Sequence, residues 1–348
     1  MKNFTFLLLV ALLVAQTAFA TSPLRRSYVH KQSNGECITV MKHGDGHFVM
    51  YTLENGMPLL ANEKGDLCYV TLQDGRAVAS ATLASSSKVQ VRTGFMTSSK
   101  EVADLLSATF TPNVETKVRN TSATNADGLG TYGVSAKGSV ASVGAPTIPV
   151  IMVQFADKKF AEDTTPEKLT RLFNEKGYAD EPMTVGSVKD FFEAQSYGLF
   201  KPSFDVVAKV EVDNGYAYYG KNSSNGSIDA KRRDLVKEAI QKAVDAGVDF
   251  SKYATNGGVP LVSIYYAGPG EHSSFEAGCE DYLWAHYANW STTVGGVKFN
   301  SYFVGNEIFQ NYKRDEETGE LVVTASAIDG IGIFCHEFSH ALGLPDFY

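Results

Sequence analysis

The residues best suited to chemistry are two histidines and a glutamate near the end of the sequence, His336, Glu337 and His340. The histidines are four positions apart, so on a helix their imidazoles lie one turn apart and can point at a single metal ion. Glu337 follows the first histidine, which brings its carboxylate to the metal's open position, where it can accept a proton from water. This HExxH pattern predicts a zinc site with two ligands and a general base.

The residues after the second histidine supply a turn and a third candidate ligand. Gly343 can adopt the left-handed conformation that ends a helix, and Pro345 prevents the helix from resuming. The turn brings Asp346 back toward the metal and completes the pattern HExxHxxGxxD, with Asp346 as the best candidate for a third protein ligand. The structural alternative is two incidental helix histidines and a turn aspartate. It leaves the spacing of these residues to chance.

An amphipathic helix over residues 331–342 must position this site. Its apolar residues recur at helical spacing and form a face that packs against a sheet, while both histidines lie on another face. Apolar runs and capping signals upstream predict strands at 148–155, 259–267 and 297–304, and helices at 165–176, 187–196 and 228–246. Because helices and strands alternate, we expect an α+β domain with a mixed, helix-covered sheet over residues 148–348.

The N-terminal part of the sequence predicts a small β-rich domain over residues 21–110. Short apolar runs between residues 28 and 82 alternate with Gly-containing turns, which indicates a meander of hairpins. Residues 98–108 favour a short helix capped by Thr97 or Ser98. Residues 111–147 are rich in Thr, Asn, Ser, Gly and Ala, so we expect a flexible linker that a protease can cut.

Residues 1–20 have the pattern of a secretory signal peptide. Lys2 gives a short positive region, Phe6–Ala15 is an apolar run too short to span a bilayer comfortably, and the small-residue motif AFA precedes position 21. A signal anchor is the alternative, but the apolar run is brief and ends in polar residues. We expect a secreted mature chain without a transmembrane segment, with the periplasm and the cell surface as other destinations.

Composition and cysteine content limit the remaining possibilities. The 348 residues are 44% hydrophobic and 20% charged with a net charge of −8, which is typical of a globular chain long enough for two domains. No long run of Lys and Arg occurs, so no nucleic-acid partner is expected. An exported chain could form disulfides between Cys37 and Cys68 and between Cys279 and Cys335, and four free thiols are the alternative.

Several segments occur in the order found in a known family. The segment FCHEFSHALGLPDFY resembles the catalytic segment of the immune inhibitor A family of secreted bacterial metallopeptidases. Upstream segments resemble the same family in the same order: IPVIMVQFADKKF, GSVKDFFEAQSYGLFKPSFDV, DFSKY, IYYAGPGE, YLWAH and IDGIGIFCHEFSH. The resemblance covers most of residues 148–348, and HGDGHFVMYTLENGMPLL is similar to the family's N-terminal region.

The resemblance implies the precursor of a zinc endopeptidase that acts on protein or peptide substrates. The implied catalytic domain is metzincin-like, a mixed sheet with an active-site helix, and a β-rich propeptide domain precedes it. His336, His340 and Asp346 match the family's zinc-binding positions, and Glu337 matches its catalytic glutamate.

Two further residues are candidate hydrogen-bond donors to the transition state, Tyr348 and His286. Aromatic packing for Tyr348 and a structural hydrogen bond for His286 are the alternatives.

The sequence departs from the family in two places. Many relatives carry an acidic, Gly-rich segment that resembles a calcium loop after DFSKY, whereas this chain has ATNGG at residues 254–258. No carboxylate occurs there, so a calcium site is not expected. A metzincin also continues into a lower subdomain beyond the third ligand, so we expect the sequence to be incomplete at its C-terminus.

Three other hypotheses remain open at this point. A thiol from Cys37 or Cys68 could occupy the fourth zinc position in a latent precursor, although a structural role explains both residues equally well. A truncated, catalytically defective metallopeptidase homologue is a second hypothesis. A surface binding or adhesion module is a third, motivated by the β-rich N-terminal part and the Tyr- and Ser-rich residues 216–227. It does not account for Glu337 between two histidines at ligand spacing.

Overall fold

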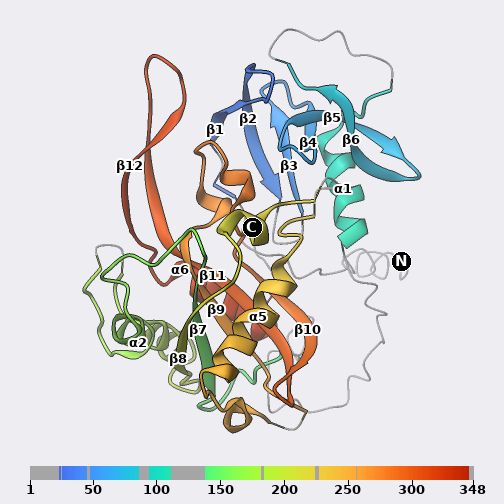
Figure 1. Cartoon of the computed structure of the whole chain (residues 1–348). Coiled ribbons are helices and arrows are strands. Elements are labelled where there is room, and N and C mark those ends of the chain that lie inside the picture. Colours follow the sequence, from blue (N-terminus) through green and yellow to red (C-terminus); the bar gives the residue numbers. More distant parts are fainter. Residues whose placement is uncertain are drawn as a thin grey trace, which may run out of the picture.

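The computed structural model describes residues 23–24, 26–44, 48–85, 94–110, 138–181, 184–223, 227–255 and 257–344. The expected signal peptide, most of the expected linker, and the candidate residues Asp346 and Tyr348 lie outside the described residues. Within the described ranges the strands form two six-stranded sheets, which we call the N-terminal sheet and the mixed sheet (Figure 1).

The N-terminal sheet is an antiparallel meander in which each strand pairs with the next along the chain. Its strands are β1 (Ser27–Lys31), β2 (Cys37–Gly44), β3 (Val49–Leu53), β4 (Pro58–Ala61), β5 (Leu67–Gln73) and β6 (Arg76–Leu83). Helix α1 (Ser99–Phe110) follows, and Ser98 Oγ caps it by accepting from the Glu101 amide at 3.2 Å. The predicted meander and short helix are confirmed.

The mixed sheet has the strand order β10-β11-β9-β7-β8, with β12 pairing β11. Its strands are β7 (Thr147–Gln154), β8 (Ser203–Glu211), β9 (Val262–Pro269), β10 (His286–Val294), β11 (Val297–Arg314) and β12 (Leu321–Ile328). β10 and β12 run antiparallel to β11, and the other neighbours are parallel. The expected mixed sheet is confirmed, although β11 runs well past the expected end at residue 304.

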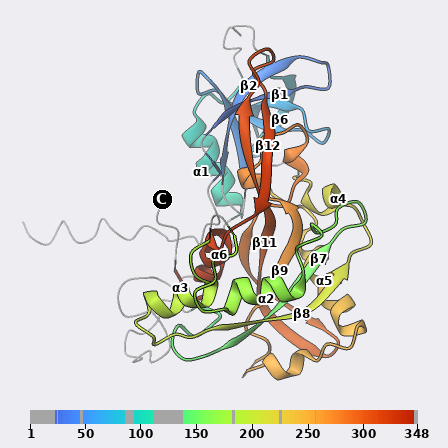
Figure 2. The same cartoon turned by 90° about the vertical axis from the view of Figure 1, so that its left-hand side faces the viewer.

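Helices cover both faces of the mixed sheet. One face carries α2 (Pro166–Asn174), α3 (Val188–Gln195) and α6 (Gly332–Ala341), and the other carries α4 (Tyr216–Gly220) and α5 (Arg232–Asp245) (Figure 2). Side chains of β7 alternate between these faces, because Val150 and Met152 join the core beneath α6 while Ile151 and Val153 join the core beneath α5. Within the described ranges, the loops hold three short 3-10 helices, η1 (Phe250–Tyr253), η2 (Glu271–Ser273) and η3 (Cys279–Asp281).

The N-terminal sheet packs directly on residues from the second part of the chain. Tyr28 of β1 shares one apolar core with Phe275 and Trp284. The hairpin of β11 and β12 extends alongside β1, where Arg314 Nη2 donates to Ser27 O at 2.8 Å (Figure 1). Among the described residues, no helix is long and apolar enough to cross a membrane.

Candidate active site

Helix α6 is fixed against the mixed sheet by a cluster of aromatic rings. The ring centroid of Phe334 lies 4.4 Å from that of Phe173 and 4.8 Å from that of Phe303. Phe338 is fully buried, and its ring centroid lies 5.0 Å from that of Phe192. Aromatic pairs of this kind add about 0.5–1.5 kcal/mol each beyond their burial. The predicted helix and its apolar face are confirmed.

The two histidines of α6 converge on one point. The Nε2 atoms of His336 and His340 lie 3.2 Å apart, and the two ring planes meet at 86°. Two nitrogens that each lie about 2.0–2.1 Å from one tetrahedral zinc ion are held about 3.3 Å apart. The separation of these two nitrogens therefore fits a shared zinc ion.

The turn at the end of α6 determines which nitrogen of His340 faces the metal position. Gly343 has a φ of 96°, and the amide of Leu344 donates to Ser339 O at 3.1 Å, which ends the helix and reverses the chain. The reversal places Leu344 O 2.8 Å from His340 Nδ1. Because a carbonyl oxygen only accepts, Nδ1 carries the proton, and Nε2 of the neutral ring offers its lone pair to a metal. The turn predicted at Gly343 is present and orients a predicted ligand.

The glutamate between the histidines is fully buried, whereas His340 is 6% exposed and His336 is half-buried. A carboxylate withdrawn from bulk water beside a cation position is well suited to accept a proton from a single water molecule. In the described part of the chain, no group of three or more His, Cys, Asp and Glu side chains could hold a metal ion. The expected third ligand, Asp346, lies two positions beyond Leu344, outside that part.

Comparisons with known proteins identify the family. The family described as "Immune inhibitor A peptidase M6, catalytic domain" matches residues 146–348, more than half of the chain. The chain belongs to this family. Immune inhibitor A of Bacillus thuringiensis subsp. alesti is 28% identical over 242 residues, which cover 57% of this chain and 33% of that protein. The pre-pro-metalloprotease PrtV of Vibrio cholerae is 27% identical over 196 residues, which cover 51% of this chain and 20% of that protein. The aligned region therefore spans a third or less of these curated relatives.

In this peptidase M6 chain, His286 does not reach the histidine pair. Its Nδ1 lies 2.8 Å from Trp284 O and its Nε2 lies 3.1 Å from the hydroxyl of Tyr302, on the face of the sheet opposite α6. This corrects the expectation of a transition-state donor, and the structural hydrogen bond is the role that His286 has. Strand alternation turns the next residue, Tyr287, toward α6, where its ring centroid lies 6.4 Å from that of His340.

His272 is a residue near the site that sequence reasoning missed. It lies in η2 with 3% of its surface exposed, and among the described residues its Nδ1 has no hydrogen-bond partner. Burial, with the nearby charges of Lys42 and His336, lowers the pKa of His272 to about 3. His272 is therefore neutral at ordinary pH and lies within electrostatic reach of both residues. No motif in the sequence marks it.

All four cysteines of this M6 chain lie within the described residues, and all four are free thiols. Cys37 is exposed, and Cys68 is buried in β5. Cys279 Sγ lies 3.7 Å from Lys42 Nζ, whereas Cys335 packs in the core beneath α6. The expected disulfides Cys37–Cys68 and Cys279–Cys335 are therefore not formed in the structure, which has the alternative state of four free thiols.

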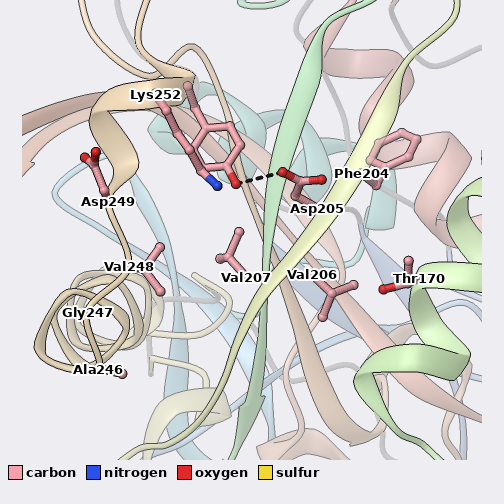
Figure 3. A pocket seen from close by; sticks show the side chains of 11 residues that line it. Thr170, Phe204, Asp205, Val206, Val207, Ala246, Gly247, Val248, Asp249 and Lys252 are labelled. Atoms are coloured by element: carbon pink, nitrogen blue, oxygen red, sulfur yellow. Dashed lines mark hydrogen bonds between the residues drawn. The ribbon is translucent and has the colours of Figure 1, made fainter.

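A surface hollow of about 630 Å³ lies beside β8 (Figure 3). It is lined by Asp205 and Val207 of β8 and by Gly247 and Tyr253 from the segment after α5. The hydroxyl of Tyr253 donates to Asp205 at 2.9 Å, the bond drawn in Figure 3. β8 ends the strand order opposite to β10, and no residue of α6 lines the hollow. The hollow is therefore separate from the candidate active site of the M6 domain.

Proposed function

We propose that this chain is the precursor of a secreted, zinc-dependent endopeptidase in which His336, His340 and Asp346 hold the zinc ion and Glu337 is the general base. The observation that carries the proposal is the 3.2 Å separation of the two Nε2 atoms. The bond from His340 Nδ1 to Leu344 O supports it, because a neutral ring that donates from Nδ1 has its lone pair on Nε2. The family match supports peptide-bond hydrolysis as the reaction.

The residues of the chain would divide the chemistry as follows. Zinc, when bound, supplies a Lewis acid that lowers the pKa of water and polarises the scissile carbonyl. The Glu337 carboxylate accepts a proton from the attacking water as the new bond to the carbonyl carbon forms. It then passes that proton to the amine nitrogen as the carbon–nitrogen bond breaks. The aromatic contacts of α6 and the Leu344 carbonyl hold the helix and the His340 ring in place throughout.

Three observations support the finer parts of the proposal. The sheet order β10-β11-β9-β7-β8, with the antiparallel strand β10 beside α6, is in keeping with a metzincin-like catalytic domain. The leader-like residues 1–20 support export. The separate N-terminal sheet supports a propeptide domain over residues 21–110, and the relative PrtV carries the name of a pre-pro-metalloprotease.

The test combines metal content with activity. The purified full chain should hold about one zinc ion and cleave casein. Glu337→Ala should keep its zinc and lose activity by about 10²–10⁴-fold, because only the proton acceptor is removed. His336→Ala should lose both zinc and activity. A wild-type chain without zinc and without activity would favour a binding module over a peptidase.

A further inference from the structure

A lysine of the N-terminal sheet is buried inside the second part of the chain. Lys42 of β2 is 1% exposed, and its Nζ donates to Glu271 O at 2.9 Å. The same Nζ lies 3.4 Å from Glu271 Oε1, and the Glu271 side chain is fully buried. The two residues are 229 positions apart in sequence. Because an unpaired buried charge is costly, this ion pair can exist only while the N-terminal sheet is seated.

The environment of the pair is built from both parts of the chain. Tyr51, which lies opposite Lys42 in the β2–β3 register, donates to Glu271 Oε1 at 3.5 Å. From the other side, Asn222 Nδ2 donates to Glu271 Oε2 at 2.9 Å. Cys279 Sγ lies 3.7 Å from the lysine nitrogen. Polar groups from two separate parts of the chain therefore meet the ion pair in a space closed to water.

An apolar contact surrounds the ion pair. Tyr28 of the N-terminal sheet packs on Phe275 with ring centroids 5.8 Å apart, and both share a core with Trp284. Backbone bonds extend the contact, because the amide of Leu24 donates to His272 O at 3.0 Å. This contact has the composition of a protein core and not that of a loose surface contact.

We propose that the surface around Glu271 is a binding site for the N-terminal sheet, and that this sheet stays bound by the Lys42–Glu271 pair after the chain is cut within residues 111–137. All the described residues that form the ion pair and the apolar contact lie outside that segment. A cut there leaves every one of these contacts in place, so separation needs the buried pair to break. The proposal goes beyond peptidase chemistry and is independent of zinc.

The experiment follows release of the cut sheet. A recognition sequence for a specific protease is inserted between Asn125 and Ala126 of the full chain in a Glu337→Ala background, which removes self-cleavage. The chain is immobilised through a C-terminal tag and cut, and the N-terminal piece still bound is measured over time. The wild-type piece should stay bound. Lys42→Met keeps the unbranched stem but leaves the buried Glu271 carboxyl without its lysine partner, so the piece should leave at least about 100-fold faster.

Matched variants separate the ion pair from general damage. Lys100→Met in the same piece removes an exposed pair with Asp104 and should leave release unchanged. Glu271→Gln alters no atom of the N-terminal sheet, so it tests the pair even if Lys42→Met does not fold. The double variant Lys42→Met with Glu271→Met should recover much of the retention, since no charge is left unpaired.

Two results would overturn the proposal. One is a cut wild-type piece that leaves as fast as the Lys42→Met piece. The other is that the N-terminal pieces of the Lys42→Met and Glu271→Gln chains leave no faster than the piece of the Lys100→Met chain. High salt supplies a further check, because a buried pair is screened far less than an exposed one. Loss of the wild-type piece at 1 M salt would show that the contact is not the buried one seen here.

Discussion

The turn at Gly343 makes a quantitative prediction about the metal site. Its φ of 96° lies in the left-handed region, so Gly343→Ala strains the backbone where Leu344 must turn back. Leu344 O lies 2.8 Å from His340 Nδ1 and fixes the orientation of that ring. The substitution therefore acts on a proposed zinc ligand without touching its side chain.

Two magnitudes follow from this geometry. Placing a residue with a side chain in the left-handed region costs about 1–2 kcal/mol, which lowers the free energy of unfolding by that amount. If the strain shifts Leu344 O away from Nδ1, the loss of an outer hydrogen bond to a ligand histidine lowers zinc affinity by about 10–100-fold. We expect both effects in Gly343→Ala, measured by denaturant unfolding and by zinc competition with a chelator.

Gly247 supplies a closely matched control. It follows α5 and has a φ of 94°. Its amide donates to Val244 O and the Val248 amide donates to Ala243 O, the same two hydrogen bonds that end α6 at Gly343 and Leu344. An added Cβ there meets nothing within 4 Å. Gly247→Ala should therefore lose the same unfolding free energy with no change in zinc affinity. Equal zinc affinities for the two variants would show that Leu344 O does not orient His340.

Two further predictions concern the packing and the pH response of the site. Phe338→Ala should lower the free energy of unfolding by about 3–5 kcal/mol in denaturant titrations. Phe191 is 39% exposed, so Phe191→Ala should lower it clearly less. Equal losses would contradict the packing of α6. Burial and nearby charges lower the pKa of His272 to about 3. His272 therefore stays neutral in the folded chain, whereas in the unfolded chain it takes up a proton near pH 6.5. Its contribution to stability is present above pH 6.5 and is lost as the pH falls toward 3. Burial raises the pKa of Glu271 to about 7, so this group changes stability with pH in the opposite sense. Both chains contain Glu271, so the difference in unfolding free energy between wild type and His272→Phe isolates the histidine. The stability of wild type relative to His272→Phe should therefore fall as the pH drops below 6.5, and a relative stability that stays constant with pH would show that His272 does not have this lowered pKa.

Local signals in the sequence were sufficient for the elements that carry the site. The apolar spacing of Phe334 and Phe338 predicts α6, and the fold confirms it because those rings pack on the sheet. Ser187 and Asp190 predict the start of α3, and both hydrogen bonds of that capping box are present. Such features depend on residues a few positions apart, which a sequence displays directly.

Features that depend on distant partners could not be predicted in this way. The helix expected from Ile228 begins at Arg232, because Ile228 is buried in the core shared with the N-terminal sheet and Asp229 has a φ of 44°. β11 extends to Arg314 because β12 pairs with its second half. Lys42 gives no sequence signal of burial, since its partner is 229 positions away.

The sequence also did not predict to which face of the sheet a side chain on a strand points. His286 and Tyr287 are neighbours on β10, and both have groups that can donate a hydrogen bond. Only the register of β10 against β11 decides that Tyr287 faces α6 and His286 faces the opposite core. A shift of one residue would exchange the two.

We propose above that one zinc ion lies between His336 and His340. Anomalous diffraction at the zinc edge from crystals of the full chain tests it most directly. We expect a single strong peak about 2.0–2.1 Å from Nε2 of both histidines, with the Asp346 carboxylate as a third neighbour. A zinc-loaded crystal whose peak lies elsewhere, or whose peak contacts neither Nε2 atom, would show that the two histidines do not share a zinc ion.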